Sequence, residues 1–262
     1  SIVEEMLEAG ELPNLAKLRD QGAYHRLGTA NPPQSPTAWS SFATCKDPGD
    51  HGIYDFLRRE PARYRPAVGF GTTEKARLNP DGSLDRPASS TNIRKGETFW
   101  HAADRQGARC VLIHIPFAYP ADDLDDSHML CGLGVPDLRG TQSTFFYFSD
   151  AFTPEQLEED LSGGMRIPLR FTEDKATAVF PGAYDSRKKG YVDTSIDVTV
   201  DRAKHALTLA SQDESLTVPE GGWSEWVDWT FPVSDTFSVK AISRFFVLEA
   251  GEQVRLYMTC LQ

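Results

Sequence analysis

A serine followed by proline, inside a proline-rich loop, is the residue of this chain best placed to do chemistry. Ser35 precedes Pro36, and Pro32 and Pro33 lie just upstream. Proline fixes its own φ and disfavours the helical conformation for the residue before it, so the loop is stiff and a helix can begin at its last proline. The pattern predicts a helix over residues 37–44, with Ser35 as its N-cap and Pro36 as its first residue.

A hydroxyl at the start of a helix lies among free backbone N–H groups, at the positive end of the helix dipole. This environment favours a bound phosphate or sulfate group. The serine can cap the helix, as serines at this position commonly do, or it can attack a bound ester if a neighbouring group lowers its pKa. The Ser-Pro pair alone favours capping, and the longer stretch around it changes this balance.

Several elements of a recognisable pattern surround Ser35. They are Leu12-Pro13-Asn14-Leu15, Gly22, PPQSPTAW from Pro32 to Trp39, Ala43-Thr44, and PGDHGIYDF from Pro48 to Phe56. The pattern resembles the nucleophile region of the type I phosphodiesterase/nucleotide pyrophosphatase family, within the alkaline phosphatase superfamily. In that family a Thr or Ser lies sixteen residues before the His of a His-Gly-Ile signature, and counting back from His51 gives Ser35. The resemblance is specific over about residues 12–56 and continues loosely to about residue 147.

The resemblance implies a hydrolase of phosphate esters that uses two divalent metal ions, usually zinc, and a phosphoserine intermediate on Ser35. Thr37 is the fallback nucleophile if the loop is offset by two residues, and its amide would help to bind the substrate phosphate. Within this chain the only metal ligand implied is the Ser35 oxygen. We expect a fragment of the family fold that lacks the N-terminal strand and the C-terminal metal ligands, and we expect this fragment alone to be inactive.

Two departures from the family pattern keep other functions open. Cys45 stands where the family usually has Gly, and Phe56 stands where many nucleotide-cleaving members have Asn. One alternative is another superfamily enzyme, such as a sulfatase, phosphomutase or lipid-headgroup phosphotransferase, although the Cys-x-Pro-x-Arg segment of sulfatases is absent. The second alternative is a non-catalytic protein whose β-rich module binds glycans or a protein partner.

The first part of the chain has the pattern of an α/β fold. We predict a strand over residues 23–29, little regular structure over residues 58–94 apart from one strand near residues 67–70, and a helix over residues 98–106. The apolar run at residues 110–115 predicts a strand buried on both faces, as in a parallel sheet. A second such strand, at residues 129–135, leads into Asp137 and Arg139. Since α/β sheets bind ligands at the carboxyl ends of their strands, these two side chains are candidate substrate-binding residues.

Alternating strand patterns dominate after residue 150. They occur at residues 196–200, 226–231, 237–242 and 254–258, and they predict an antiparallel β module with one buried face. We therefore divide the chain into a partial α/β core with the nucleophile loop, residues 1–149, and a β-rich insertion, residues 150–262. Trp223, Trp226 and Trp229 could stack on carbohydrate, but three residues at this spacing cannot share one strand face, so packing in the core and at edges is the favoured interpretation.

The composition excludes several classes of protein. The net charge is −11, which argues against binding a nucleic-acid backbone and is compatible with a small phosphate ester as the substrate. The four cysteines are widely separated and form no Cys-x-x-Cys zinc motif. No apolar run approaches the roughly 18 residues needed to span a bilayer. The compartment and the oligomeric state stay open.

Overall fold

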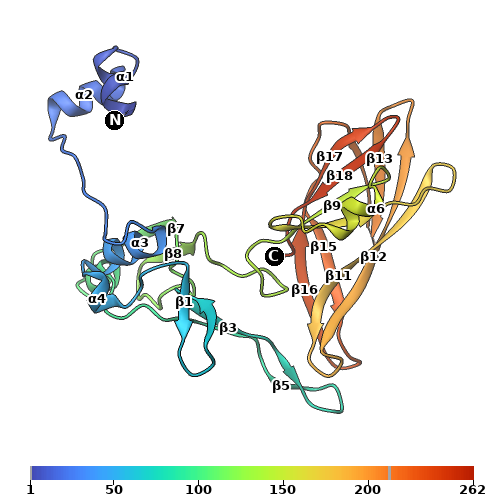
Figure 1. Cartoon of the computed structure of the whole chain (residues 1–262), viewed down its shortest axis with the longest axis horizontal. Coiled ribbons are helices and arrows are strands. Elements are labelled where there is room, and N and C mark those ends of the chain that lie inside the picture. Colours follow the sequence, from blue (N-terminus) through green and yellow to red (C-terminus); the bar gives the residue numbers. More distant parts are fainter. Residues whose placement is uncertain (1, 212–213) are drawn as a thin grey trace.

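The computed structural model describes residues 2–211 and 214–262. Figure 1 shows a pair of helices near the N-terminus, a central group of short helices and strands, and a large β-rich module. The chain exposes 16266 Å² to solvent. A compact monomer of the same mass would expose about 11,000 Å². The excess indicates that these regions are loosely joined and do not share one core.

The first region consists of helices α1 (Ile2–Glu8) and α2 (Pro13–Gln21). Residues 22–34 form an extended connection between these helices and the rest of the chain (Figure 1), so the predicted strand at residues 23–29 is wrong. The Arg26 guanidinium donates two hydrogen bonds to Glu4 at 2.8 and 2.9 Å, which lowers the pKa of Glu4 to about 2. This ion pair holds the beginning of the connection against α1.

The central region is built from three short helices and one pair of parallel strands. These are α3 (Ser35–Thr44), α4 (Pro48–His51), α5 (Phe99–Asp104), β7 (Val111–Ile115) and β8 (His128–Cys131). Their buried cluster joins Ala43 of α3, Trp100 of α5 and Leu112 of β7. Both helices therefore pack on the face of the strand pair that carries Leu112.

The opposite face of the β7–β8 pair is open to solvent. Val111 and Ile113 are each 65% exposed, and Leu130 is 56% exposed. The prediction that residues 110–115 are buried on both faces is therefore wrong for the described structure. The mixed α/β composition is confirmed, but the parallel arrangement in this region extends to two strands among the described residues.

The segment predicted to have little regular structure beyond one strand near residues 67–70 instead forms three short antiparallel pairs. They are β1 (Leu57–Glu60) with β2 (Arg65–Val68), β3 (Gly71–Glu74) with β6 (Ser89–Asn92), and β4 (Arg77–Leu78) with β5 (Leu84–Arg86). Strand β2 overlaps the predicted strand. The strands are short and mostly exposed, and most of them are polar, so they lack the apolar alternation by which strands are recognised.

The β-rich module contains three sheets and one short helix, α6 (Pro154–Glu158). The first sheet has the order β10 (Gly164–Pro168), β9 (Phe145–Ser149), β18 (Val254–Met258), β17 (Phe245–Ala250). The second has the order β11 (Lys175–Asp185), β12 (Gly190–Asp201), β13 (Ala206–Ser211), β14 (Glu214–Pro219). The third pairs β15 (Val227–Pro232) with β16 (Ser238–Ser243). All pairs are antiparallel except β9 with β10.

The inner faces of these sheets meet in an aromatic core. Phe180 of β11 lies 5.2 Å from Phe146 of β9 and 5.3 Å from Trp229 of β15, measured between ring centroids. Phe245 of β17 completes the contact on the other side of Trp229. All four side chains are fully buried. Burial of such large apolar surfaces is the main stabilisation of the module.

The division of the chain at residue 149 stays a prediction. Strand β9, which ends at Ser149, lies between β10 and β18 in the first sheet of the module. Phe146 and Phe148 of this strand belong to the module's core. The segment just before the predicted boundary therefore contributes its side chains to the β-rich part.

Candidate functional site

Helix α3 begins one residue earlier than the sequence predicts. Gln34 is the N-cap, with extended φ and ψ of −105° and 142°, and its carbonyl accepts the first helical hydrogen bond from the Ala38 amide at 2.9 Å. Ser35 is then the first helical residue and Pro36 the second. The expected capping role of Ser35 is wrong, and the Gln34 side chain makes no cap hydrogen bond.

The start of α3 leaves donors available for an anion. Ser35 is exposed, and Pro36 has no N–H to donate. Because the first helical hydrogen bond comes from Ala38, the amides of Ser35 and Thr37 have no intrahelical acceptor. Two free N–H groups and an exposed hydroxyl therefore lie together at the positive end of the helix dipole.

Thr37 differs from Ser35 in its access to solvent. The residue is fully buried, and its Oγ1 atom has no hydrogen-bond partner among the described residues. An unpartnered buried hydroxyl is unusual in a folded protein and costs roughly 1–3 kcal/mol. Of the two candidate nucleophiles, only Ser35 is open to an incoming ester in this conformation.

An open hollow of about 890 Å³ runs along the side of α3. Its walls come from residues 27–31 of the extended connection, from Ala38, Ser41 and Phe42 of the helix, and from residues 47–49. Ser35 stands one turn before Ala38 on the same helix.

His51 joins α4 to α3 through a defined pair of hydrogen bonds. The Ile53 amide donates to Nδ1 at 3.1 Å, so the proton of the neutral ring is on Nε2, which donates to Ser41 Oγ at 2.9 Å. Burial and then the positive charge of Arg94 lower the pKa of His51, while Asp47 and Asp50 act in the opposite direction. Since its lone-pair nitrogen is already bonded to the backbone, His51 positions two helices and is not placed to act as a base toward Ser41.

We expect the free energy of unfolding to fall as the pH falls below about 6.5, the ordinary value for histidine. The unfolded chain then binds a proton that the folded His51 resists, so stability is present above the unfolded pKa and is lost as the pH falls through the folded pKa. Urea unfolding at a series of pH values measures this slope. The variant His51→Gln should flatten it, whereas His25→Gln, in the exposed connection, should leave it unchanged. An unchanged slope in His51→Gln would contradict the assignment.

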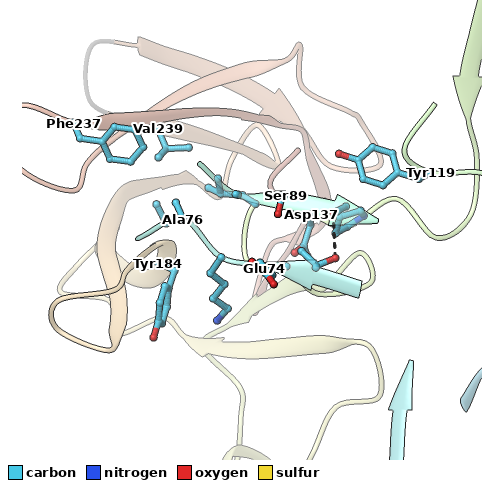
Figure 2. Close-up of a pocket in the computed structure, with 16 residues that line it drawn as sticks. Glu74, Ala76, Ser89, Tyr119, Asp137, Tyr184, Phe237 and Val239 are labelled. Carbon is cyan, nitrogen blue, oxygen red and sulfur yellow. Dashed lines mark hydrogen bonds between the residues drawn. The ribbon is translucent and has the colours of Figure 1, made fainter. Parts of the chain in front are cut away.

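Asp137 lies at a pocket of about 260 Å³ between the β3–β6 pair and the β-rich module (Figure 2). Its carboxylate accepts hydrogen bonds from the amides of Arg139, Thr141 and Thr144, and from the Thr141 hydroxyl. These bonds occupy both oxygens and fix the loop from residue 137 to residue 144. The pocket walls are mainly apolar, and Tyr119, Tyr184, Phe237 and Val239 are among the residues that line it (Figure 2).

Arg139 packs against aromatic rings and has no ion pair among the described residues. Its guanidinium carbon lies 4.7 Å from the centre of the Tyr191 ring, and Nη1 donates to the Met165 sulfur at 2.8 Å. Its buried Nε has no acceptor. No described hydrogen bond, ion pair or pocket connects Arg139 or Asp137 to Ser35, so their assignment to substrate binding stays a prediction.

The residues present do not fit the two-metal site that the resemblance implies. No group of three His, Cys, Asp or Glu side chains in residues 2–211 and 214–262 is arranged to hold a metal ion. The ring nitrogens of His51 and the oxygens of Asp137 are engaged within the protein. The Ser35 hydroxyl by itself would give a metal a single ligand.

Comparison with known proteins finds one match, to a protein family. A family model described as type I phosphodiesterase / nucleotide pyrophosphatase matches residues 2–247. The match extends into the β-rich module, about a hundred residues beyond the region in which the sequence pattern could be followed. No curated protein and no solved structure matches the chain. Among the described residues, no helix is both long and apolar enough to cross a membrane.

Proposed function

The chain belongs to the type I phosphodiesterase/nucleotide pyrophosphatase family, and we propose that it carries the nucleophile of a phosphate ester hydrolase, Ser35. The observation that carries this proposal is the exposed Ser35 hydroxyl on the first turn of α3, beside two amides without intrahelical acceptors. The buried state of the Thr37 hydroxyl supports Ser35 over the fallback nucleophile.

The proposed reaction has two displacements at phosphorus. The Ser35 oxygen forms a bond to phosphorus, the ester P–O bond breaks, and the alcohol leaves with a proton, which produces a phosphoserine. Water then attacks this phosphorus, the bond to the Ser35 oxygen breaks, and the hydroxyl is regenerated as phosphate leaves. The Thr37 amide and the helix dipole would stabilise the negative charge on the phosphoryl oxygens in both steps.

Activation of the Ser35 hydroxyl requires groups that the described residues do not bring to it. The family is generally dependent on divalent metal ions, and we propose that the native protein is as well, without assigning a metal to any residue of this chain except the Ser35 oxygen. Asp137 and Arg139 are retained as candidate substrate-binding residues.

We expect residues 1–262 on their own to hydrolyse no phosphate ester. A serine hydroxyl without a neighbouring base or metal ion is a weak nucleophile, and the described residues provide no metal-binding group of three or more ligands. The measurement is an assay of the isolated chain with a nitrophenyl phosphodiester and monoester, with and without added zinc. Turnover by this chain that disappears in Ser35→Ala would show that the activating groups lie within the 262 residues.

Trapping the covalent intermediate tests the proposed function itself. The native protein would be mixed with a phosphate ester, quenched in acid and digested, and the peptides would be analysed by mass spectrometry. A phosphate on Ser35 supports the proposal. A phosphate on Thr37, or none in an actively hydrolysing protein, would overturn it.

A further inference from the structure

An aromatic surface covers the outer face of the first sheet of the β-rich module. In an antiparallel sheet with one buried face, the other face is normally polar. Here Phe246 of β17 pairs with Tyr257 of β18, and Tyr257 pairs with Tyr147 of β9. Their strand neighbours Phe245, Leu256 and Phe148 point into the core. The three partly exposed rings therefore form a row across the outside of the sheet.

Two tryptophans extend this row into solvent. Trp223 forms a bridge with Phe246, and its ring lies 5.1 Å from that ring and 6.0 Å from the ring of Tyr257. Trp223 is 49% exposed and Trp226 is 53% exposed. Trp229 behaves differently, since it is fully buried and donates its indole N–H to Ser243. The sequence prediction of core and edge packing thus describes Trp229, whereas about half of the surface of Trp223 and of Trp226 is exposed to water.

Arg244 lies against both exposed indoles. Its guanidinium carbon is 5.3 Å from the centre of the Trp223 ring and 5.6 Å from that of Trp226, within cation–π distance of each. Its Nε donates to the Ser224 carbonyl at 2.8 Å, which fixes the side chain. Neither terminal nitrogen has a hydrogen-bond partner among the described residues, and no described carboxylate forms an ion pair with Arg244. Its terminal N–H donors are therefore not used within the described structure, and the residue is partly exposed.

We propose that Trp223, Trp226 and Arg244 form a binding site for an acidic carbohydrate. The C–H groups of a sugar ring are weakly positive and lie well against the negative face of an indole, and a carboxylate or sulfate on that ring pairs with the guanidinium fork. One guanidinium contacts both indoles, so a ligand of one or two rings can reach all three side chains. This inference does not depend on the proposed hydrolysis.

Charge favours a short acidic oligosaccharide over a nucleic acid. The chain has a net charge of −11, so a long polyanion would be repelled, and nucleic-acid binding needs clustered Lys and Arg. Of the nearby arginines, Arg255 is paired with Glu249, and Arg166 donates to two backbone carbonyls. Arg244 is therefore the cation to which we assign the acidic group.

Calorimetric titration of the whole chain tests the proposal with matched sugars. The carboxylate probe is an oligogalacturonate, with its methyl ester as the neutral control. The sulfate probe is a sulfated galactan oligosaccharide, with its desulfated form as the neutral control. We expect at least one acidic probe to bind, and its neutral counterpart to bind about tenfold more weakly or worse. Whichever acidic probe binds identifies the acidic group.

Three variants separate this site from a general effect of charge or stacking. Trp226→Ala and Arg244→Gln should each weaken binding about tenfold or more. Tyr64→Ala, which removes another exposed ring that pairs with an arginine, should leave it unchanged. Trp226 is half exposed, so its loss should not unfold the module, and circular dichroism checks this. Failure of both acidic probes to bind, equal binding of the neutral forms or of polyglutamate, or full binding by both site variants would overturn the proposal.

Discussion

Replacing Ser35 by alanine in the native protein is expected to abolish the covalent phosphate and to lower turnover of a phosphate ester by about a thousandfold or more. In the proposed reaction this hydroxyl forms the bond to phosphorus, and no other exposed hydroxyl stands on the first turn of α3 in the described structure. The loss should appear in kcat and in kcat/KM alike, since the helix amides that bind the phosphate remain. Steady-state kinetics together with phosphopeptide analysis measures both effects.

Two variants on the same helix serve as controls. Thr37→Val removes a buried hydroxyl that has no partner, so folding should be unaffected or slightly improved and turnover should persist. Ser41→Ala removes the hydroxyl that accepts from His51 and should mainly lower stability. If Thr37→Val abolished turnover while Ser35→Ala retained it, the nucleophile would be offset by two residues, as the fallback prediction has it.

Replacing Trp100 by alanine is expected to cost about 3–5 kcal/mol and to unfold the central region while the β-rich module stays folded. Trp100 is fully buried and is the largest member of a cluster whose other buried residues are Ala43 and Leu112. Its indole N–H donates to Asp122 at 2.7 Å, so the substitution also leaves a carboxylate short of one donor. A region with so small a core cannot absorb this loss by repacking.

Amide hydrogen exchange distinguishes the two regions in this variant. Amides of α3 and β7 should lose protection in Trp100→Ala, and amides of β12 should keep it. Trp100→Phe keeps most of the ring volume and should cost much less, whereas Trp226→Ala, at a half-exposed position, should change stability by less than about 1 kcal/mol. Equal loss of protection in α3 and β12 would show that the two regions fold as one unit.

The strands of the β-rich module could be predicted because buried apolar residues alternate with exposed residues along each strand. Ile196, Val198 and Val200 are buried in β12 as the sequence pattern requires, and β15, β16 and β18 fall within one or two residues of their predicted ranges. Each strand has one face toward a single aromatic core. Period-two burial is then visible in the sequence itself.

Three features that the sequence did not predict each have their own physical reason. The pair β3–β6 is polar and the pair β1–β2 is mostly exposed, so no buried apolar period marks them. The run around Ile113 is apolar enough for a fully buried strand, yet sequence alone does not reveal that one face is left uncovered. Likewise, Asp137 follows a strand as ligand-binding carboxylates often do, and only the folded loop shows that its oxygens are taken by Thr141 and Thr144.

The spacing of residues in the sequence identified the candidate nucleophile, but it did not predict the local geometry of that residue. The distance in sequence from His51 identified Ser35, but the N-cap of the helix is Gln34, which is extended and makes no side-chain cap hydrogen bond. The aromatic surface was visible in the sequence only as a run of tryptophans. Its assignment needed the pairing of Arg244 with Trp223 and Trp226, which lie about twenty residues away in sequence.

The position of β9 between β10 and β18 has a consequence for the order in which the protein is made. Its antiparallel partner β18 is synthesised about a hundred residues later, which at about 5–20 residues per second means a delay of roughly 5–20 s. During that time Phe146 and Phe148 lack the strand that covers them on one side. A ribosome-bound nascent chain thus exposes these two apolar side chains until residue 258 has emerged, and long-range closure of this kind makes folding slow.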